Sequence, residues 1–513
     1  MERAEVLIIG SGLAGLIAGL TAADLGKEVV LITKTAELMS GSTPYAQGGI
    51  IYKGVNDSQE KLIRDIMIAG DGACWMPAVE QLAEIGPELV KKILLEKYNV
   101  KFDMNDNNLD FTEEAAHSVR RIIHSKDNTG RTIHESLIPY VLKHPNIKVY
   151  TNHTAVDLLT LSHHSVESTD IYKKPACFGA YVLNNLTGEV SAFYANNTIL
   201  ATGGLGQIYI NTTNPEESTG DGIALAYRAG ARMFNLHYVQ FHPTTIFTQK
   251  ERFLVSESVR GEGAVLVDKN GQQFMHKYHE LKELAPRDIV ARGIYDTMLE
   301  THHQCVYLDI RHKDTEWIRK RFPTINEYLH GIGIDMTSQL IPVVPAAHYS
   351  CGGVGVSLQG RTSLQRLYSA GEVACTGVHG ANRLASTSLL EAVTWGWIVG
   401  TEVAEPTPED EYFPEIYDWE EETESMDSAL IAQDWLTIKN TMWNYVGLVR
   451  TRQRMHRAQQ ILRHLTSEIE DFYRKAKLTR EIIQLRNGVT TAYAVTNSAI
   501  EDRISRGSHF VKK

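Results

Sequence analysis

The sequence has little cysteine and no long hydrophobic run. Its 513 residues include only five cysteines, which are scattered and form no CxxC pair, so neither a zinc site nor a redox disulfide is predicted. No apolar run reaches the roughly 18 residues of a membrane helix, and the charged first residues lead into an apolar strand rather than a cleavable signal. These absences favour a protein of the reducing cytoplasm with no membrane partner.

Positive charge is also scarce. Lysine and arginine number 51 against 62 aspartates and glutamates, a formal net charge of -11, which argues against nucleic acid as the main partner. Histidines pair at His276 and His279 and at His302 and His303, but no third ligand has a suitable spacing, so no metal site is predicted. Hydrophobic residues make up 43% of the chain, enough for a large core in about three domains.

The N-terminal segment has the pattern of a dinucleotide-binding unit. Residues 6–9 and 29–32 are short apolar strand patterns, and the stretch between them is helical in composition. The glycines of residues 10–15 match GxGxxG at the strand–helix turn, where a helix N-terminus can face a pyrophosphate. Thr33 and Lys34 stand where NAD-binding proteins carry an acid, so NAD is disfavoured.

Two later strand ends favour FAD as the dinucleotide. Residues 198–204 and 367–372 each have the pattern of a buried strand that ends in glycine. Because FAD is long, it needs several strand ends, and Glu372 is placed to bind a hydroxyl of the flavin's chain.

The chain is therefore predicted to have an α/β fold with three parts. A doubly wound FAD-binding domain occupies residues 1–235 and 348–404, and an inserted α+β capping domain, with many His and Arg residues, occupies 236–347. After an acidic stretch with prolines at 405–411, a C-terminal helical domain is expected over 418–513. Its helix–helix core is predicted from Trp435, Ile438, Met442, Tyr445 and Val449.

Motifs along essentially the whole chain resemble the succinate dehydrogenase and fumarate reductase flavoprotein family. The motifs of the wider family lie at residues 42–49, 240–244, 260–263 and 286–288. Those similar to its L-aspartate-oxidising branch lie at residues 347–354, 380–383 and 442–450. The resemblance implies oxidation of L-aspartate to iminoaspartate by FAD, with oxygen or fumarate as the acceptor. The product would feed quinolinate and NAD synthesis, with a transient contact to quinolinate synthase.

The resemblance also implies where FAD binds. The implied contacts are Gly10, Ser11, Gly12, Leu13, Ala14, Gly15, Lys34, Ser42, Thr43, Ala46, Gln47, Gly48, Gly49, Val156, Asp157, Asp221, Glu372, Ser388 and Leu389. Succinate dehydrogenases carry a histidine bonded covalently to the flavin at the position of Ser42. Because a serine hydroxyl does not form that bond, we expect non-covalent FAD.

L-Aspartate has two carboxylates and an ammonium group, so its pocket needs donors at both ends and one acceptor. The carboxylate ligands implied by the resemblance are His242, Ser256, His348 and Arg383. Glu114 matches the partner of the amino group, and the adjacent Glu113 leaves a one-residue alternative.

Three residues match the family's catalytic groups. Arg287 corresponds to the arginine that donates a proton when fumarate is reduced, and its part in aspartate oxidation is left open. Glu257 and Arg260 resemble the relay that connects this arginine to solvent, with a structural salt bridge as the alternative for Glu257.

Two other functions compete with the oxidase. The chain could be a soluble fumarate reductase or succinate-oxidising flavoprotein, if Glu114 does not reach the substrate. It could also be a flavin-bearing subunit that mainly docks a partner, which activity of the isolated chain would contradict.

Overall fold

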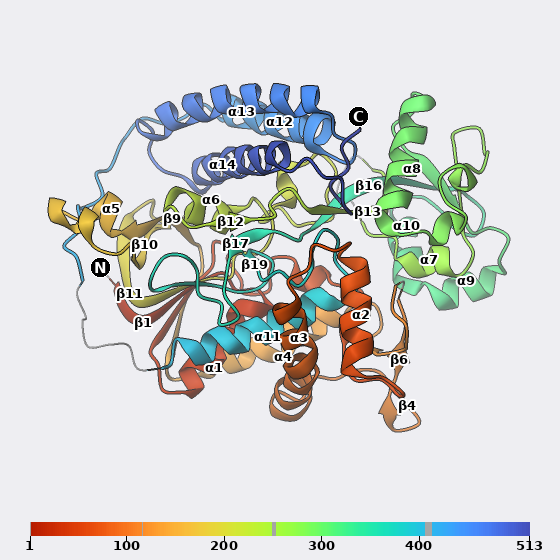
Figure 1. The fold of residues 1–513 in the computed structure, drawn as a ribbon, viewed down its shortest axis with the longest axis horizontal. Helices are drawn as coiled ribbons and strands as arrows, with labels where there is room; N and C mark the ends of the chain where they lie inside the picture. Colours follow the sequence, from red (N-terminus) through yellow and green to blue (C-terminus); the bar gives the residue numbers. More distant parts are fainter. Residues whose placement is uncertain (1, 115, 249–252, 406–412, 513) are drawn as a thin grey trace.

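The predicted N-terminal βαβ unit is present (Figure 1). The computed structural model describes residues 2–114, 116–248, 253–405 and 413–512. Strands β1 (Glu2–Ile9) and β2 (Val29–Ile32) pair in parallel, and helix α1 (Leu13–Asp24) connects them. Because α1 is apolar on nearly every side, it is buried between this sheet and helix α11 (Thr387–Glu402).

The main sheet collects strands from distant parts of the chain. Its spatial order is β8 (Ile147–Tyr150), β2, β1, β11 (Val190–Leu200), β10 (Cys177–Asn184) and β9 (His153–Thr160), and β18 (Leu367–Ser369) also pairs with β11. The pairs from β8 to β11 and the pair of β11 with β18 are parallel, whereas β10 is antiparallel to both of its neighbours. The carboxyl ends of β1, β2, β11 and β18 therefore meet at one edge, the usual ligand edge of an open α/β sheet.

Helices cover the face of the sheet on which α1 lies (Figure 1). Besides α1 and α11, these are α2 (Gln59–Ala69), α3 (Met76–Leu89), its π-helical continuation over Val90–Lys97, and α4 (Thr129–Lys143). Short strands accompany them: β3 (Ile50–Ile51), β4 (Met104–Asn105), β5 (Asn108–Leu109), β6 (Phe111–Thr112) and β7 (Ile122–Ile123).

A second, antiparallel sheet forms the capping part at the right of Figure 1. Its order is β13 (Val239–Ile246), β16 (Ile341–Ser350), β15 (Val306–Asp309) and β14 (Val265–Val267). Its helices are α7 (Glu257–Gly261), α8 (Arg287–Glu300), α9 (Thr315–Arg321) and α10 (Pro323–Gly331). This part has a hydrophobic core of its own, which includes Val255, Phe274 and Ile294.

Three C-terminal helices pack on the other side of the main sheet (Figure 1). They are α12 (Ser428–Val446), α13 (Arg452–Tyr473) and α14 (Arg480–Glu501), and α14 lies against α6 (Asp221–Arg228). Of the predicted stripe, Ile438 and Met442 are fully buried, whereas Val449 follows the end of α12. The remaining short elements are α5 (Leu161–His164), β12 (Met233–Phe234), β17 (Gly353–Gly355), β19 (Ala374–Cys375) and 3-10 turns at Thr43–Tyr45, Ser168–Tyr172, Gly206–Ile208, Met275–Lys277 and Lys282–Leu284.

The predicted mixed α/β architecture with a capping sheet and C-terminal helices is confirmed, while the domain bounds stay predictions. Residues 406–411 of the predicted linker lie outside the described residues. Within the described part of the chain, no helix is both long and apolar enough to cross a membrane. The same residues contain no cluster of three or more His, Cys, Asp or Glu side chains that could hold a metal ion.

Candidate active site

One large cavity, of about 2030 Å³, joins the glycine-rich edge of the main sheet to the capping part. The predicted site residues that line it are Gly10, Ser11, Gly12, Leu13, Ala14, Lys34, Ser42, Thr43, Ala46, Gln47, Gly48, Gly49, Glu114, Asp221, His242, Ser256, Glu257, Arg287, His348, Glu372, Arg383, Ser388 and Leu389. Gly15, Val156, Asp157 and Arg260 are not among its lining residues. The cavity thus brings together groups that lie far apart in the sequence.

The glycine turn is shaped by close approach of the backbone. Gly10 has a φ of +116°, and a Cβ added there would lie 2.3 Å from the Ala201 oxygen. A Cβ on Gly15 would lie 2.1 Å from the Gly10 oxygen, so Gly15 serves the packing of helix on strand rather than the cavity. Gly12 precedes α1 without a side-chain cap, and the N–H of Leu13 donates to Thr43 Oγ1 at 3.1 Å. The N-terminus of α1 therefore borders the cavity.

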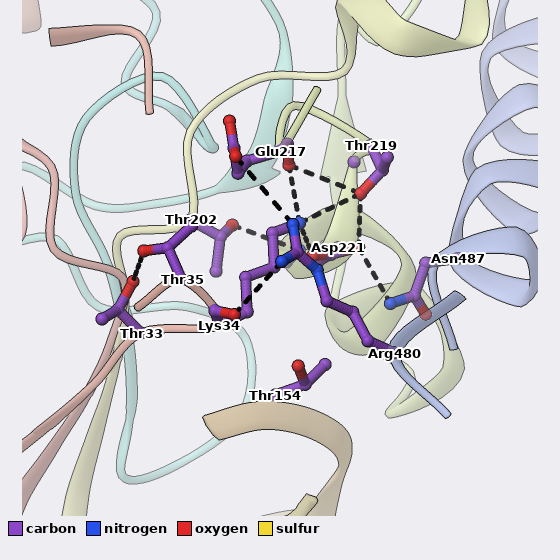
Figure 2. Close-up of polar contacts among 12 residues, drawn as sticks. Thr33, Lys34, Thr35, Thr154, Thr202, Glu217, Thr219, Asp221, Arg480 and Asn487 are labelled. Carbon is purple, nitrogen blue, oxygen red and sulfur yellow. Dashed lines mark hydrogen bonds and ion pairs between the residues drawn. The ribbon is translucent and has the colours of Figure 1, made fainter. Parts of the chain in front are cut away.

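An acid reaches the end of β2 from another element (Figure 2). Lys34 Nζ donates to Asp221 Oδ2 at 2.5 Å, to the Glu217 carbonyl at 2.7 Å and to Thr219 Oγ1 at 3.2 Å. Asp221 Oδ1 accepts from Thr219 Oγ1 at 2.8 Å and from Asn487 Nδ2 at 3.0 Å. Burial opposes ionisation of Asp221, but Lys34 and the other donors hold its pKa below the usual value. The first residue of α6 thus supplies the acid that β2 lacks.

Val156 and Asp157 differ from the expected flavin contacts. Asp157 accepts from Arg228 Nε and from Arg486 Nη1, each at 2.8 Å, and the Val156 carbonyl accepts from Arg228 Nη2 at 3.1 Å. These two arginines keep the Asp157 carboxylate in an ion-pair network away from the cavity wall. On β9 it is residues 154–155 that line the cavity.

Glu372 is a buried acid in the cavity wall. Its Oε1 accepts a hydrogen bond from the Ser350 N–H at 3.0 Å, and burial raises its pKa to about 7. A Cβ on Gly204 would lie 2.2 Å from the same oxygen, so Gly204 leaves room for the carboxyl group.

Arg383 is held from three sides. Its Nη1 donates to Ser388 Oγ at 3.0 Å, its Nη2 donates to Gln240 Oε1 at 3.3 Å, and its guanidinium lies 4.4 Å from the centre of the Tyr349 ring. Tyr349 in turn donates to the buried Glu391 at 2.9 Å. Among the described residues, the buried Nε of Arg383 has no hydrogen-bond partner. A positive donor fixed in this way suits a carboxylate ligand.

Two histidines stand beside the arginines. The rings of His242 and His348 lie edge to face with centroids 5.5 Å apart, and His348 Nδ1 lies 2.8 Å from Thr213 Oγ1. Burial lowers the pKa of both rings well below the usual value, and the nearby Arg287 lowers it further. Both imidazoles are therefore neutral at pH 7.

Helices α7 and α8 bring the predicted catalytic groups together. Arg287 Nε donates to Glu257 Oε2 at 2.6 Å, and Arg260 Nη2 lies 3.6 Å from Glu257 Oε1. Burial opposes ionisation of Glu257, but the two guanidinium groups hold its pKa below the usual value. Arg260 is only 1% exposed and donates to the Glu283 carbonyl, whereas Glu257 and Arg287 line the cavity. Ser256 is the N-cap of α7 beside them, and its Oγ accepts a hydrogen bond from the Ser258 N–H at 3.4 Å.

Glu114 lies against the predicted flavin loop. Its Oε2 accepts from Ser386 Oγ at 2.7 Å, and its Oε1 is 2.8 Å from where a Cβ on Gly48 would stand. Glu113 also lines the cavity but is exposed, whereas Glu114 is half-buried. The adjacent residue 115 of this motif lies outside the described residues.

Sequence reasoning missed the residues that support the site. Gln240 and Tyr349 are neighbours of predicted ligands within recognised motifs, which was an available signal. Ser386, Thr213 and Asn487 act across long separations in sequence, and no local pattern indicated them.

Comparisons with known proteins cover the entire chain. Residues 5–389 match the family model described as FAD binding domain, and residues 436–512 match the one described as fumarate reductase flavoprotein C-term. The L-aspartate oxidase of Pseudomonas aeruginosa is 42% identical, over 99% of this chain and 94% of that protein. The L-aspartate oxidase of Yersinia pestis is 41% identical, over 99% of this chain and 95% of that protein.

Solved structures extend the comparison to the fold. A mutant quinol fumarate reductase FrdA from E. coli has a TM-score of 0.86 at 25% identity, covering 100% of this chain and 92% of that one. A Mycobacterium smegmatis Sdh1 complex chain has a TM-score of 0.84 at 26% identity, covering 100% and 89%. The shared fold thus includes the capping sheet and the C-terminal helices.

Proposed function

This chain belongs to the L-aspartate oxidase family of FAD-binding flavoproteins, and on that premise we propose that it oxidises L-aspartate to iminoaspartate with non-covalently held FAD. The observation that carries the proposal is the composition of the cavity wall. The carboxylate of Glu114 and the guanidinium groups of Arg287 and Arg383 line the same cavity. It therefore offers an acceptor for an ammonium group together with donors for carboxylates.

The cavity fits FAD on its glycine-rich side. Gly10 and Gly204 stand where a side chain would collide with backbone or with Glu372, so the glycine turn packs directly on its neighbours and Glu372 has room at the cavity. The N-terminus of α1 suits a pyrophosphate, and Glu372 suits a hydroxyl of the flavin's chain. When bound, the flavin would supply the hydride acceptor for the substrate's α-carbon. Ser42 in place of a histidine supports a cofactor that can dissociate.

The capping side fits a dicarboxylate with an amino group. We assign the substrate carboxylates to Arg383, His242 and His348, with the Ser256 hydroxyl as a further donor. Glu114 accepts hydrogen bonds from the ammonium group. The neutral imidazoles donate without adding charge, so the positive charge of the pocket comes from the arginines.

Glu257 keeps Arg287 charged and oriented at the substrate. Burial opposes the charge of Arg287, but Glu257 and Glu114 outweigh it and raise its pKa above the usual value. A fixed guanidinium aligns a carboxylate during aspartate oxidation and can donate a proton in fumarate reduction. Arg260 is a second cation beside Glu257, so the three groups together carry a net positive charge.

The electron acceptor, the fate of the product and the location of the protein are further parts of the proposed function. Oxygen or fumarate would reoxidise the flavin, and iminoaspartate would feed quinolinate and NAD synthesis through transient contact with quinolinate synthase. A cytoplasmic location is supported by the five cysteines, none of which forms a disulfide in the described residues.

One anaerobic experiment tests cofactor and substrate together. The purified chain should be yellow, and L-aspartate added without oxygen should bleach its flavin absorbance. Bleaching by succinate but not by L-aspartate would replace the oxidase with the succinate-oxidising alternative. Turnover of L-aspartate with oxygen by the isolated chain would exclude a subunit that only docks a partner.

A further inference from the structure

Helix α14 of the C-terminal domain touches the wall of the cofactor cavity through a buried asparagine. Asn487 is fully buried, and its Nδ2 donates to Asp221 Oδ1 at 3.0 Å (Figure 2). Its Oδ1 accepts from Arg228 Nη1 at 2.9 Å. Asp221 lines the cavity whereas Asn487 does not, so the asparagine can act on a ligand only through Asp221.

Other residues of α14 bind the backbone next to Asp221 and at Lys34. Thr491 donates from Oγ1 to the Gly220 carbonyl at 3.0 Å, directly before Asp221. Arg480, the first residue of α14, donates to the Lys34 carbonyl at 3.4 Å (Figure 2). The Lys34–Asp221 pair is therefore connected to α14 by hydrogen bonds from Arg480, Asn487 and Thr491.

Asn487 also separates two charged groups of residues. On one side is the Lys34–Asp221 ion pair, and on the other are Asp157, Arg228 and Arg486. A neutral amide can donate to the first and accept from the second at once. A carboxylate in its place could accept from Arg228 but would repel Asp221.

We propose that Asn487 is a positioning residue for FAD, which fixes the Asp221 carboxylate at the cavity and couples FAD binding to the docking of the C-terminal helices. The inference rests on the proposed FAD site. Asn487 holds the Asp221 carboxylate at the cavity wall, so less ordering is required when the cofactor enters.

The test compares substitutions at two asparagines of α14. Asn487→Asp and Asn487→Leu are matched with Asn497→Asp and Asn497→Leu. Asn497 accepts a 2.9 Å bond from Gln459 of α13 and does not line the cavity. Flavin-free protein is titrated with FAD, and binding is followed by quenching of flavin fluorescence. Asn487→Asp and Asn487→Leu should weaken binding about ten- to hundredfold, the scale of one hydrogen bond to a charged group. The Asn497 variants should stay within about twofold of wild type.

A second readout separates positioning from general stability. Asn487→Asp keeps the acceptor for Arg228 but repels Asp221, so its flavin-free form should unfold at a lower temperature than wild type. The further stabilisation that added FAD gives, measured against each protein's own flavin-free form, should shrink in the Asn487 variants and stay that of wild type in the Asn497 variants. A Kd for FAD within twofold of wild type in a folded Asn487→Asp variant would overturn the proposal. If wild type itself binds no FAD, the cofactor assignment fails, which is a different result.

Hydrogen exchange tests the same proposal on the wild-type protein, so it does not depend on whether the variants fold. FAD should slow amide exchange at residues 485–491 of α14 more than at residues 495–501. Equal exchange with and without FAD over 485–491 would refute the coupling.

Discussion

Ser386 and Glu114, 272 residues apart in the sequence, are joined by a 2.7 Å hydrogen bond from the serine hydroxyl to Oε2 of the carboxylate. Ser386 directly precedes α11 and has a φ of +58°, and Ser388 and Leu389 of that helix line the cavity. The bond therefore ties the loop that carries Glu114 to the wall proposed for the flavin. The other carboxylate oxygen, Oε1, lies next to Gly48.

Glu114→Gln should weaken aspartate oxidation strongly while fumarate reduction stays intact or improves. The amide keeps the shape but loses the charge that the substrate ammonium requires. A hydrogen bond between charged groups contributes about 1.5 to 3 kcal/mol, or roughly ten- to a hundredfold in selectivity. The measurement is the ratio of kcat/KM for L-aspartate and fumarate in both proteins, because a ratio cancels losses of folding or flavin occupancy.

Glu113→Gln is the matched control, since the neighbouring acid is exposed. Its ratio should stay near that of wild type. If the ratio fell in Glu113→Gln and stayed unchanged in Glu114→Gln, the partner of the amino group would be Glu113. An equal fall of both activities in Glu114→Gln would make Glu114 a structural acid.

Arg287→Leu should retain the flavin spectrum but lose about 10² to 10⁴ in the rate of fumarate reduction, the usual cost of losing an active-site proton donor. Arg292→Leu provides the control on the same helix, because Arg292 pairs with Asp288 and does not line the main cavity. Steady-state assays with reduced flavin as the electron source give the comparison. Near-wild-type turnover in a correctly folded Arg287→Leu protein would refute the assignment.

Local patterns predicted the parts of the fold that local physics determines. The apolar runs at 6–9 and 29–32, with the glycines between them, form the parallel βαβ unit as expected. The recognised motifs likewise led to the family to which the chain belongs. Side-chain pairs such as Asn487 with Asp221, 266 residues apart, follow only from how the domains pack, so no spacing in the sequence signals them.

Asp157 shows the limit of transferring contacts by motif alone. The sequence places an acid on β9, the strand whose residues 154–155 line the cavity, but it cannot show that this acid is paired with Arg228 and Arg486. Conversely, the sequence shows that no acid follows β2, where Thr33 and Lys34 stand. Only the three-dimensional structure shows that Asp221 of α6 lies at that place, paired with Lys34.

Acid or heat precipitation of the purified protein should leave the yellow cofactor in the supernatant. Ser42 lines the cavity at the position of the family's covalent histidine, its hydroxyl is 3.4 Å from Ser218 Oγ, and a hydroxyl does not form the flavin–histidyl bond. Absorbance of the supernatant and the mass of the denatured chain measure the outcome. Flavin that remains with the precipitated polypeptide would contradict non-covalent binding.

Glu372 predicts a pH dependence of the flavin-free protein. Burial raises the pKa of Glu372 from the ordinary value of 4.5 to about 7, so the folded protein binds this proton more tightly than the unfolded chain. The free energy of unfolding should therefore fall as pH rises between about 4.5 and about 7, because the carboxyl must ionise in a buried site. Glu372→Gln removes that penalty. The free energy of unfolding of Glu372→Gln, relative to that of wild type, should rise by up to about 3 kcal/mol between these pH values and stay constant above them.

Thermal denaturation of the flavin-free proteins at pH 5, 6, 7 and 8 measures this difference. Glu257→Gln is the control of opposite sign, because Arg287 and Arg260 hold the pKa of Glu257 below its usual value. Glu257 therefore remains ionised throughout that range, and its removal should destabilise the protein by an amount that does not change with pH. If the difference for Glu372→Gln were equally constant, Glu372 would be ionised in the folded protein at pH 5. Its carboxylate would then need a positive or hydrogen-bonding partner beyond the Ser350 N–H, and its proposed role toward the flavin's hydroxyl would be that of a charged acceptor.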